Sequence, residues 1–339
     1  MDVKLRGVIS GFGEVAARGH LPGWLSRPDV SIVAVHDPVS ERRHLAMRLA
    51  NNVRVYDDLE LMLAGESPEF VDIASPPALH ASAIRAALEA GAHVLCEKPL
   101  CLRADEFKAL AETAARGSRV LMCVHNWKHS PSYRRALELV ASGRLGALTL
   151  LNIDRLRTQP AGGPGSWRAA AALGGGILID HGWHVSYLMQ SLMHGDAPLA
   201  VSAHLGVSRE GEVEDVADLR VRFSGGRIAR SYMSWRAPVR RTSASLYGEF
   251  AALEIEGDRL VLTERGGRTE ELSVVDAPDD SYHSAWFTGV AAEFERAIAE
   301  GPGSAAAIRN ITEVSTALRL IEAARESSAR AGAEIALAD

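Results

Sequence analysis

The chain has 339 residues, of which 47% are hydrophobic and 24% are charged, and its formal net charge at pH 7 is −6. This length predicts two domains, because single hydrophobic cores stop growing beyond about 250–300 residues. The composition is that of a globular protein and excludes disordered and fibrous classes. The negative net charge argues against a nucleic-acid partner, which usually requires a basic stripe. Arginine pairs at 42–43, 134–135 and 240–241 are isolated and are interpreted as solvated surface.

Other features of the sequence favour a cytoplasmic protein. There is no run of about 18 apolar residues, so no membrane partner is expected. A strand-like pattern begins within the first few residues, which leaves no room for a signal peptide. Cys96, Cys101 and Cys123 form no CxxC pair and are odd in number, which predicts buried, reduced thiols.

The first 124 residues alternate between strand-like and helical patterns. Strands are expected at 3–10, 30–36, 70–74, 93–96 and 119–124, and helices at 40–50, 80–90 and 103–116. Strands that alternate with helices of this length indicate βαβ units and a parallel sheet buried on both faces. Residues 1–124 are therefore predicted to form a doubly wound α/β domain of the Rossmann type, which binds dinucleotides.

The pattern changes after residue 125. A helix is expected at 132–142, a strand at 149–156, a Gly/Pro-rich loop at 159–165 and a second helix after the glycines at 174–176. Strands then dominate beyond 199, with hairpin signals at 224–226 and 256–258, and helices return at 285–299 and 305–330. Residues 125–339 are predicted to form an α+β domain with an open, mostly antiparallel sheet and its helices on one face.

A glycine-rich segment follows the first strand and opens a helix. Residues 11–16 (GFGEVA) fit G-x-G-x-x-G/A, in which the first glycine makes a tight turn and the second lets the backbone approach a pyrophosphate. The amides of the helix N-terminus would then bind the anion. A lone match also describes an ordinary strand-to-helix turn. The candidate cofactor residues in this segment are Gly11, Phe12, Gly13, Glu14 and Val15.

Further candidate cofactor residues lie where other strands end. Asp37 follows the second strand, where an acidic residue accepts hydrogen bonds from the adenosine ribose and repels a 2′-phosphate. NAD is therefore preferred to NADP, although Arg42 lies near enough to accommodate a phosphate. Ligands of doubly wound sheets bind beyond the carboxyl ends of the strands. The other candidates at such ends are Ser75, Pro76, Pro77, His80, Glu97 and Lys98.

Three residues form a candidate acid–base group. Lys98 follows the strand at 93–96 and would donate to a substrate oxygen. The alternative interpretation is a lysine on the surface without a role in the reaction. Asp180 and His184 are four residues apart on an otherwise apolar helix, so they share one face. Burying a polar group among apolar residues costs free energy, so these two residues are expected to have a role. Histidine is suited to accepting and returning a hydroxyl proton. A capping pair is the alternative, and a metal site with His181 is not expected because no third ligand is evident.

These motifs together resemble one family. The chain resembles the glucose–fructose oxidoreductase / inositol dehydrogenase / rhizopine-catabolism family, usually called Gfo/Idh/MocA. The resemblance rests on segments 11–16, 35–38, 75–80, 96–100, 125–127, 174–176 and 180–184, in this order. Two positions depart from the family pattern. Ala16 replaces the third glycine of the loop, and Trp127 stands where relatives often carry arginine.

The resemblance implies an activity and site residues. Lys98, Asp180 and His184 would be the catalytic residues of an NAD(P)-dependent oxidoreductase acting on a secondary hydroxyl of a sugar, cyclitol or related polyol. It also implies a Lys98–Pro99 peptide that is often cis, and a homodimer or homotetramer joined through the sheet of the second domain. The expected substrate contacts are Asn126, Trp127, Lys128, Arg155, Arg157, Trp167 and His181.

Two alternative functions remain open from the sequence. The first is a glycoside hydrolase that uses NAD for transient oxidation. The second is a protein that senses NAD(P) without chemistry. Lys98, Asp180 and His184 together argue against the sensor, because a sensor needs no acid–base pair.

Overall fold

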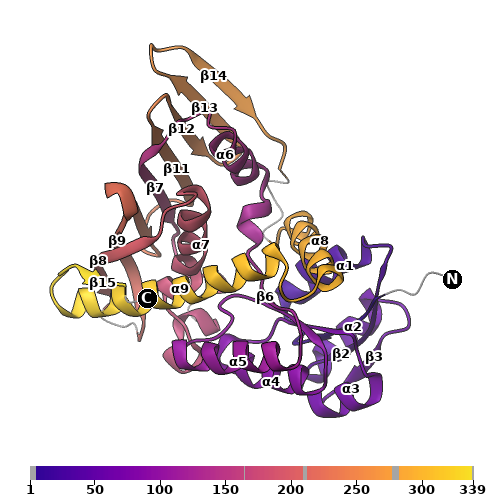
Figure 1. The fold of residues 1–339 in the computed structure, drawn as a ribbon. Helices are drawn as coiled ribbons and strands as arrows, with labels where there is room; N and C mark the ends of the chain where they lie inside the picture. The colour runs from indigo at the N-terminus through magenta and orange to yellow at the C-terminus, as the bar shows by residue number, and fades with distance from the viewer. Residues whose placement is uncertain (1–4, 164, 209–211, 277–281, 338–339) are drawn as a thin grey trace. The chain divides into compact units, whose positions relative to one another are not determined.

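The computed structural model describes residues 5–163, 165–208, 212–276 and 282–337 (Figure 1). The chain divides into two compact units. The first unit is Met1–His129 with Ala277–Ser315, and the second is Ser130–Asp276 with Thr316–Asp339. The domain limits expected from the sequence, 1–124 and 125–339, stay a prediction, and the two units are used below to locate each residue.

The first unit is built on a parallel sheet, as the sequence predicted, with six strands instead of the five expected. The strands lie in the order β3-β2-β1-β4-β5-β6. They are β1 (Leu5–Ser10), β2 (Val30–His36), β3 (Arg54–Tyr56), β4 (Phe70–Ile73), β5 (His93–Cys96) and β6 (Leu121–Cys123). The chain order reverses between β1 and β4, and dinucleotides bind at such a switch point. The sequence did not indicate β3 or helix α3 (Leu59–Glu66), because three half-exposed residues carry no clear strand pattern.

Helices cover this sheet. They are α1 (Leu21–Leu25), α2 (Ser40–Leu49), α4 (His80–Glu89), α5 (Ala104–Arg116) and α8 (Ser284–Glu300). Helix α8 was counted with the second domain in the sequence analysis, but its apolar side packs in the core of the first unit. A Cβ at Gly23 would lie 2.6 Å from the ring of Phe287. The absence of a side chain at Gly23 is therefore what admits Phe287 from α8 to this core.

The last strand of the first sheet is completed by a side chain. The N–H of Cys123 in β6 donates to Oδ1 of Asn310 at 2.8 Å, and Nδ2 of Asn310 donates to the carbonyl of Cys123 at 2.9 Å. Asn310 lies in helix α9 (Ala305–Ala329). Its amide thus pairs both backbone groups of Cys123, as a neighbouring strand would. Cys96, Cys101 and Cys123 are buried, as predicted, and none is in a disulfide.

The second unit contains a nine-stranded sheet in the order β14-β13-β12-β11-β7-β10-β9-β8-β15. Among the described strands only the β7–β10 pair is parallel, so the predicted, mostly antiparallel sheet is confirmed. Both predicted hairpins are present, at 224–226 and at 257–258. The strands are β7 (Leu148–Leu156), β8 (Pro198–Val207), β9 (Glu214–Phe223), β10 (Ile228–Ser234), β11 (Arg241–Gly248), β12 (Ala251–Glu256), β13 (Arg259–Glu264), β14 (Thr269–Ser273) and β15 (Ile335–Ala336).

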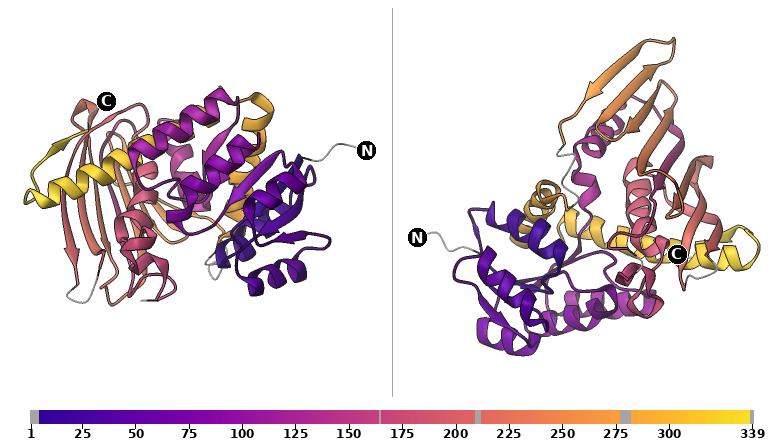
Figure 2. Two further views of the ribbon diagram at one scale, coloured as in Figure 1. Left: turned by 90° about the horizontal axis from the view of Figure 1, so that it is seen from below. Right: turned by 180° about the vertical axis from the view of Figure 1, so that it is seen from behind.

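Helices lie on one face of the second sheet (Figure 2). They are α6 (Pro131–Ala141), α7 (Trp183–Leu192) and the C-terminal part of α9. Met189 of α7, Leu320 of α9 and Leu219 of β9 line one small apolar cavity between these helices and the sheet. On β9 the apolar residues alternate with partly exposed Arg220 and Arg222, the period that the sequence indicated. None of the helices among the described residues is long and apolar enough to cross a bilayer.

Candidate active site

The glycine loop after β1 has the geometry of a dinucleotide loop. Gly11 has φ +88° and its N–H donates to the carbonyl of His36 at 2.8 Å. A Cβ at Gly11 would lie 2.6 Å from the backbone N of Ser75, so only glycine fits between the ends of β1 and β4. A Cβ at Gly13 would meet nothing within 4 Å. The backbone at Gly13 is therefore open to the close approach of an anion, while that at Gly11 is packed.

Asp37 is held at the end of β2 by this loop. Its Oδ2 accepts from the N–H of Phe12 at 2.7 Å, and its Oδ1 accepts from the N–H of Val39 at 2.9 Å. The side chain is buried, yet each carboxylate oxygen has capacity for a further donor. These residues fit a dinucleotide, because a fixed carboxylate beside the glycine loop is the acceptor that the ribose hydroxyls require.

The cations near Asp37 already have partners. Nη1 of Arg42 lies 3.0 Å from Oε1 of Glu14, a residue of the glycine loop. Nη1 of Arg43 donates to the carbonyls of Asp37 at 2.7 Å and Pro38 at 3.0 Å. The charge of Arg42 is therefore partly balanced by a carboxylate.

His80 connects two of the predicted cofactor segments. Its Nε2 lies 2.7 Å from the carbonyl of Ser75, and its Nδ1 lies 2.6 Å from the carbonyl of Pro99. The ring is fully buried, and burial lowers its pKa. Both ring nitrogens thus face carbonyl oxygens of the protein, and the neutral ring donates to one of the two. The predicted contact of His80 with the cofactor stays a prediction. Oγ of Ser75 is buried and has no hydrogen-bond partner among the described residues, which leaves it for a bound ligand.

Lys98 follows β5 at the same edge of the sheet. Its side chain is 8% exposed, and the Lys98–Pro99 peptide is cis, as the resemblance implied. The N–H of Lys98 donates to Oε2 of Glu97 at 3.0 Å. The other carboxylate oxygen of Glu97, Oε1, lies 3.1 Å from Nε2 of His20. Both oxygens of Glu97 are therefore engaged beside Lys98, while its predicted contact with the cofactor stays a prediction.

His20 joins Glu97 to a second buried carboxylate. Its Nδ1 lies 3.0 Å from both oxygens of Asp72 in β4, and Nε1 of Trp24 donates to Oδ2 of Asp72 at 2.7 Å. Although burial opposes the charge, Asp72 and Glu97 raise the pKa of His20 to about 10. His20 is therefore an imidazolium at neutral pH. His20 was not among the predicted site residues, although an aspartate within the apolar run 70–74 is a signal, because a buried carboxylate needs a partner.

In the second unit Asp180 is held by Arg168 and lies close to His181. It is 3% exposed, and its Oδ1 accepts from Nε of Arg168 at 3.0 Å. Its Oδ2 lies 3.4 Å from Nε2 of His181. A Cβ at Gly175 would clash with the carbonyl of Arg168, so the glycine turn is what allows this segment to pack close. Arg168 was not among the residues predicted for the site.

The helical segment that carries Asp180 and His184 changes from a π-helix to an α-helix between the two residues. Asp180 lies in the π-helical turn η6 (Leu178–Gly182), and His184 lies in α7. The sequence indicated a single helix, and short π-helical turns occur often at functional sites. Nδ1 of His184 lies 2.7 Å from the hydroxyl of Tyr187, and both side chains are buried. This contact orients the imidazole ring.

The predicted substrate contacts fall in both units. Asn126, Trp127 and Lys128 form η3 (Asn126–His129) in the first unit. Arg155, Arg157, Trp167 and His181 belong to the second unit, as do Asp180 and His184, whereas Lys98 belongs to the first. The guanidinium of Arg168 stacks on the ring of Trp167, 4.6 Å from its centroid.

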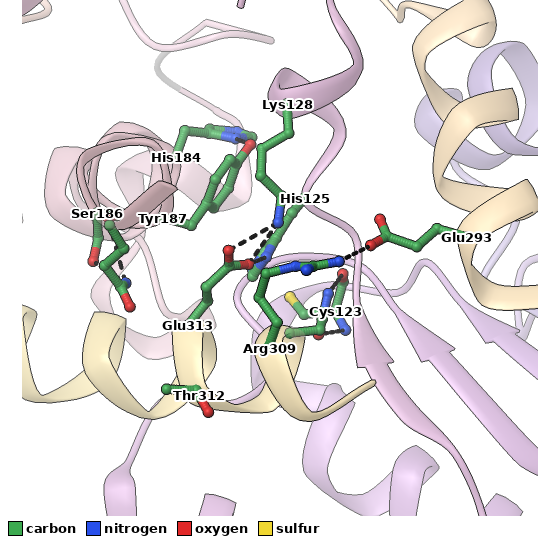
Figure 3. A network of polar contacts seen from close by, with 12 residues as sticks. Cys123, His125, Lys128, His184, Ser186, Tyr187, Glu293, Arg309, Thr312 and Glu313 are labelled. Carbon is green, nitrogen blue, oxygen red and sulfur yellow. Dashed lines mark hydrogen bonds and ion pairs between the residues drawn. The ribbon is translucent and has the colours of Figure 1, made fainter. Parts of the chain in front are cut away.

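Lys128 takes part in a buried polar network (Figure 3). Its Nζ lies 2.9 and 2.7 Å from the two carboxylate oxygens of Glu313 in α9, and Nδ1 of His125 lies 2.8 Å from Oε2. Burial opposes the charge of Glu313, but Lys128 and His125 lower its pKa to about 2. The ammonium of Lys128 is thus held by Glu313, a residue that the sequence did not indicate. Among the described residues no group of three His, Cys, Asp or Glu side chains could hold a metal ion.

A parallel sheet with a switch point, an open glycine loop and a fixed acidic residue after β2 defines a dinucleotide-binding domain. Residues 5–125 match the family described as "Oxidoreductase family, NAD-binding Rossmann fold", and residues 133–254 match the "GFO/IDH/MocA C-terminal domain". The chain belongs to the Gfo/Idh/MocA family of oxidoreductases.

Individual relatives agree with this family. The chain is 32% identical over 201 residues to D-glucoside 3-dehydrogenase of Escherichia coli, which covers 59% of this chain and 57% of that protein. It is 27% identical to D-apiose dehydrogenase of Paraburkholderia graminis over 66% of this chain and 58% of that protein. The chain spans about half the length of the first curated relatives it matches.

Solved structures share the fold. GenD2 from gentamicin A biosynthesis, in complex with NAD, has a TM-score of 0.84 at 24% identity, over 99% of this chain and 97% of that chain. Levoglucosan dehydrogenase in complex with NADH has a TM-score of 0.86 at 20% identity, over 99% of this chain and all of that chain. At these identities the likeness concerns the fold of the chain.

Proposed function

We propose that the chain is an NAD(P)-dependent oxidoreductase that moves a hydride between nicotinamide and a secondary hydroxyl or ketone of a sugar, cyclitol or related polyol. The observation that carries the proposal is within the first unit, where Lys98 and the glycine loop stand at the same carboxyl edge of the parallel sheet. His80 ties the two together through Ser75 and Pro99. The names of two relatives, D-glucoside 3-dehydrogenase and D-apiose dehydrogenase, support a sugar-like substrate.

The residues that would hold the cofactor are those around the glycine loop. Gly13 leaves room for the pyrophosphate, Asp37 accepts from the ribose hydroxyls, and Oγ of Ser75 is a buried polar atom available to the ligand. When bound, NAD supplies the hydride acceptor and NADH the donor. NAD is preferred to NADP, because Asp37 would repel a 2′-phosphate and Arg42 is paired with Glu14.

The chain's own residues would supply the proton chemistry. His184 takes the hydroxyl proton at Nε2, since its Nδ1 is engaged by Tyr187. The ammonium of Lys98 steadies the developing oxyanion, and Asp180, fixed by Arg168, orients the hydroxyl. General-base action of this kind is typically worth about 10²–10⁴-fold in rate.

The test is a pair of variants with matched controls. Lys98→Ala and His184→Ala are expected to abolish turnover while NADH still binds, as followed by its fluorescence. The exposed residues Lys108 and His194 provide the controls Lys108→Ala and His194→Ala, which should keep full activity. Unchanged turnover in Lys98→Ala or His184→Ala would refute the catalytic assignment.

The same assay separates the two rival functions. Stoichiometric NADH formation with inositols, aldoses or amino-cyclitols supports the dehydrogenase. Cleavage of aryl glycosides without net NADH formation would support the NAD-dependent glycoside hydrolase instead. Tight binding of NADH without turnover of any of these compounds would support a sensor.

Two further expectations belong to this proposal. We expect a homodimer or homotetramer joined through the face of the second sheet that carries Arg220 and Arg222, opposite the helices. Light scattering coupled to gel filtration measures the mass, and a monomer at micromolar concentration would refute the expectation. The cytoplasmic location expected from the sequence stays a prediction.

A further inference from the structure

His20 reaches the interior of the first unit from the helical segment that follows the glycine loop. It is the last residue of the π-helical turn η1 (Ala16–His20), and it is 2% exposed. The N–H of Ala17 donates to the carbonyl of Gly13 at 2.9 Å, so the helical segment is continuous with the loop. Short π-helical turns occur often at functional sites. A buried histidine therefore stands on the element that is expected to bind the cofactor.

Both ring nitrogens of His20 face carboxylates. Nδ1 lies 3.0 Å from both oxygens of Asp72, and Nε2 lies 3.1 Å from Oε1 of Glu97. A neutral imidazole carries one N–H and could donate to only one of these carboxylates, whereas an imidazolium donates to both. Although burial opposes the charge, the two carboxylates raise the pKa of His20 to about 10, which agrees with this geometry.

Stability alone does not account for this arrangement. Asp72 already has a second donor, because Nε1 of Trp24 donates to its Oδ2 at 2.7 Å. Replacing a buried ion network by apolar residues of similar volume is often neutral or stabilising, so such a network is weak evidence for a stabilising role. The other end of this network is what distinguishes it, because Glu97 immediately precedes Lys98.

Glu97 connects His20 to Lys98. Its N–H donates to the carbonyl of Ile73 at 2.7 Å, which fixes its backbone at the end of β4, and its Oε2 accepts from the N–H of Lys98 at 3.0 Å. Although burial opposes the charge of Glu97, His20 and Lys98 lower its pKa. An ionised Glu97 thus holds the backbone of Lys98 and attracts its ammonium. A neutral ring at His20 would leave either Asp72 or Glu97 without its donor.

We propose that His20 is a positioning residue for Lys98, so that its charge serves the chemical step of the proposed reaction. Nε2–H of His20 keeps the carboxylate of Glu97 ionised and turned toward the backbone of Lys98. The inference rests on the proposed function, because it takes Lys98 to steady the developing oxyanion of the substrate. Loss of the contact between His20 and Glu97 should therefore lower kcat and leave the binding of cofactor and substrate unchanged.

The first experiment separates positioning from stability. His20→Asn leaves the charge of Asp72 uncompensated, whereas His20→Asn/Asp72→Asn removes both charges and should be the more stable of the two. Both variants lose the donor to Glu97, so both should lower kcat to the same extent, by about 10–100-fold. The substrates are inositols, aldoses and amino-cyclitols with NAD, and the KM values and the affinity for NADH should stay unchanged. A kcat that recovers with stability in the double variant would overturn the inference.

Arg27→Gln is the matched control. Nε of Arg27 donates to Oε1 of Glu295 in α8 at 2.7 Å, so this variant also removes a cation from an ion pair within the first unit. It should lower the free energy of unfolding, measured with urea, and leave kcat unchanged. If kcat fell as far in Arg27→Gln as in His20→Asn, the effect would be one of stability, and the inference would be wrong.

The second experiment tests whether His20 acts through Glu97. Glu97→Gln removes the charge but keeps an oxygen that can accept from the N–H of Lys98. If the effect passes through Glu97, adding Glu97→Gln to His20→Asn/Asp72→Asn should lower kcat no further than the larger of the two separate effects. Effects on kcat that multiply would show that His20 and Glu97 act independently, and this result would contradict the proposal.

Hydrogen–deuterium exchange gives a readout that needs no turnover. The amide of Lys98 donates to Glu97, so it should exchange faster in His20→Asn/Asp72→Asn than in the wild type, and at the wild-type rate in Arg27→Gln. Turnover by the wild type with an unchanged kcat in the double variant would overturn the inference and leave the oxidoreductase intact. Without turnover of any polyol the proposed function is refuted. Faster exchange in the double variant would then still support the contact from His20 through Glu97 to Lys98, and equal exchange would overturn it.

Discussion

Nδ1 of His20 lies 3.0 Å from both carboxylate oxygens of Asp72, in the interior of the first unit. The same ring reaches Glu97 through Nε2 and stacks on Phe287 of α8 at a centroid distance of 3.9 Å. An imidazolium is thus enclosed between two carboxylates, and one of them accepts from the backbone of Lys98. His20 is a positioning residue, because it acts on Lys98 through Glu97.

The first prediction concerns the free energy of unfolding of this buried pair. His20→Asn removes a cation and leaves Asp72 buried with its charge uncompensated, which is expected to cost about 3–5 kcal/mol. The double variant His20→Asn/Asp72→Asn should recover part of that loss, because the uncompensated charge is gone. Urea unfolding of both variants measures the difference. Equal stability of the single and double variants would contradict the assigned pairing.

The second prediction is the pH dependence of stability. The pKa of His20 is about 10 in the folded protein against an ordinary value of 6.5. The folded state therefore holds this proton more tightly than the unfolded chain, so its contribution is complete below about pH 6.5 and declines as the pH rises toward 10. Asp72 and Glu97 are the charged groups that face the ring. Urea midpoints measured from pH 6 to 10 should fall more steeply for the wild type than for the double variant, and parallel curves would refute the prediction.

The third prediction uses two glycines of one loop. Gly11→Ala places a methyl group 2.6 Å from the backbone of Ser75 at φ +88°, so we expect a marked loss of stability. Gly13→Ala meets no protein atom within 4 Å, so the fold should be unaffected while NADH affinity falls. Thermal unfolding and NADH fluorescence titration measure the two effects. Tight NADH binding by a stable Gly13→Ala variant would contradict the placement of the pyrophosphate.

The fourth prediction concerns the choice of cofactor. Asp37→Ser removes the carboxylate that would accept from the ribose hydroxyls and would repel a 2′-phosphate. Affinity for NADH should fall by about tenfold or more, and the ratio of NADPH to NADH affinity should rise. Glu14→Gln should shift the ratio in the same direction, since it releases Arg42 from its ion pair. An unchanged ratio in both variants would refute the role given to Asp37.

Local patterns in the sequence predicted much of the fold. The alternation of strands and helices predicted the parallel sheet. The turn residues at 224–226 and 257–258 predicted two hairpins of the second sheet. These features depend on neighbouring residues, so a single sequence reports them. The short strand β3 and the π-helical turn at Asp180 have no comparable local signal.

The candidate site was predictable only in part. Gly11, Asp37 and Lys98 stand at strand ends, and topology places such positions at one edge of the sheet. The partners that hold these groups come from distant segments, such as Glu313 for Lys128 and His20 for Glu97. A contact between residues so far apart in the chain produces no periodic pattern in the sequence from which it could be predicted. Asp72 carried a signal that was not used, since a charge within an apolar strand requires a buried partner.

The amide of Asn310 has a consequence for how molecules of this protein meet one another. An exposed strand edge presents unpaired N–H and C=O groups, which can pair with a strand of another molecule. At Cys123 both groups are already taken by Asn310. Strand β6 is therefore closed to intermolecular pairing at this residue, and a single side chain of α9 protects the outer strand of the parallel sheet against aggregation.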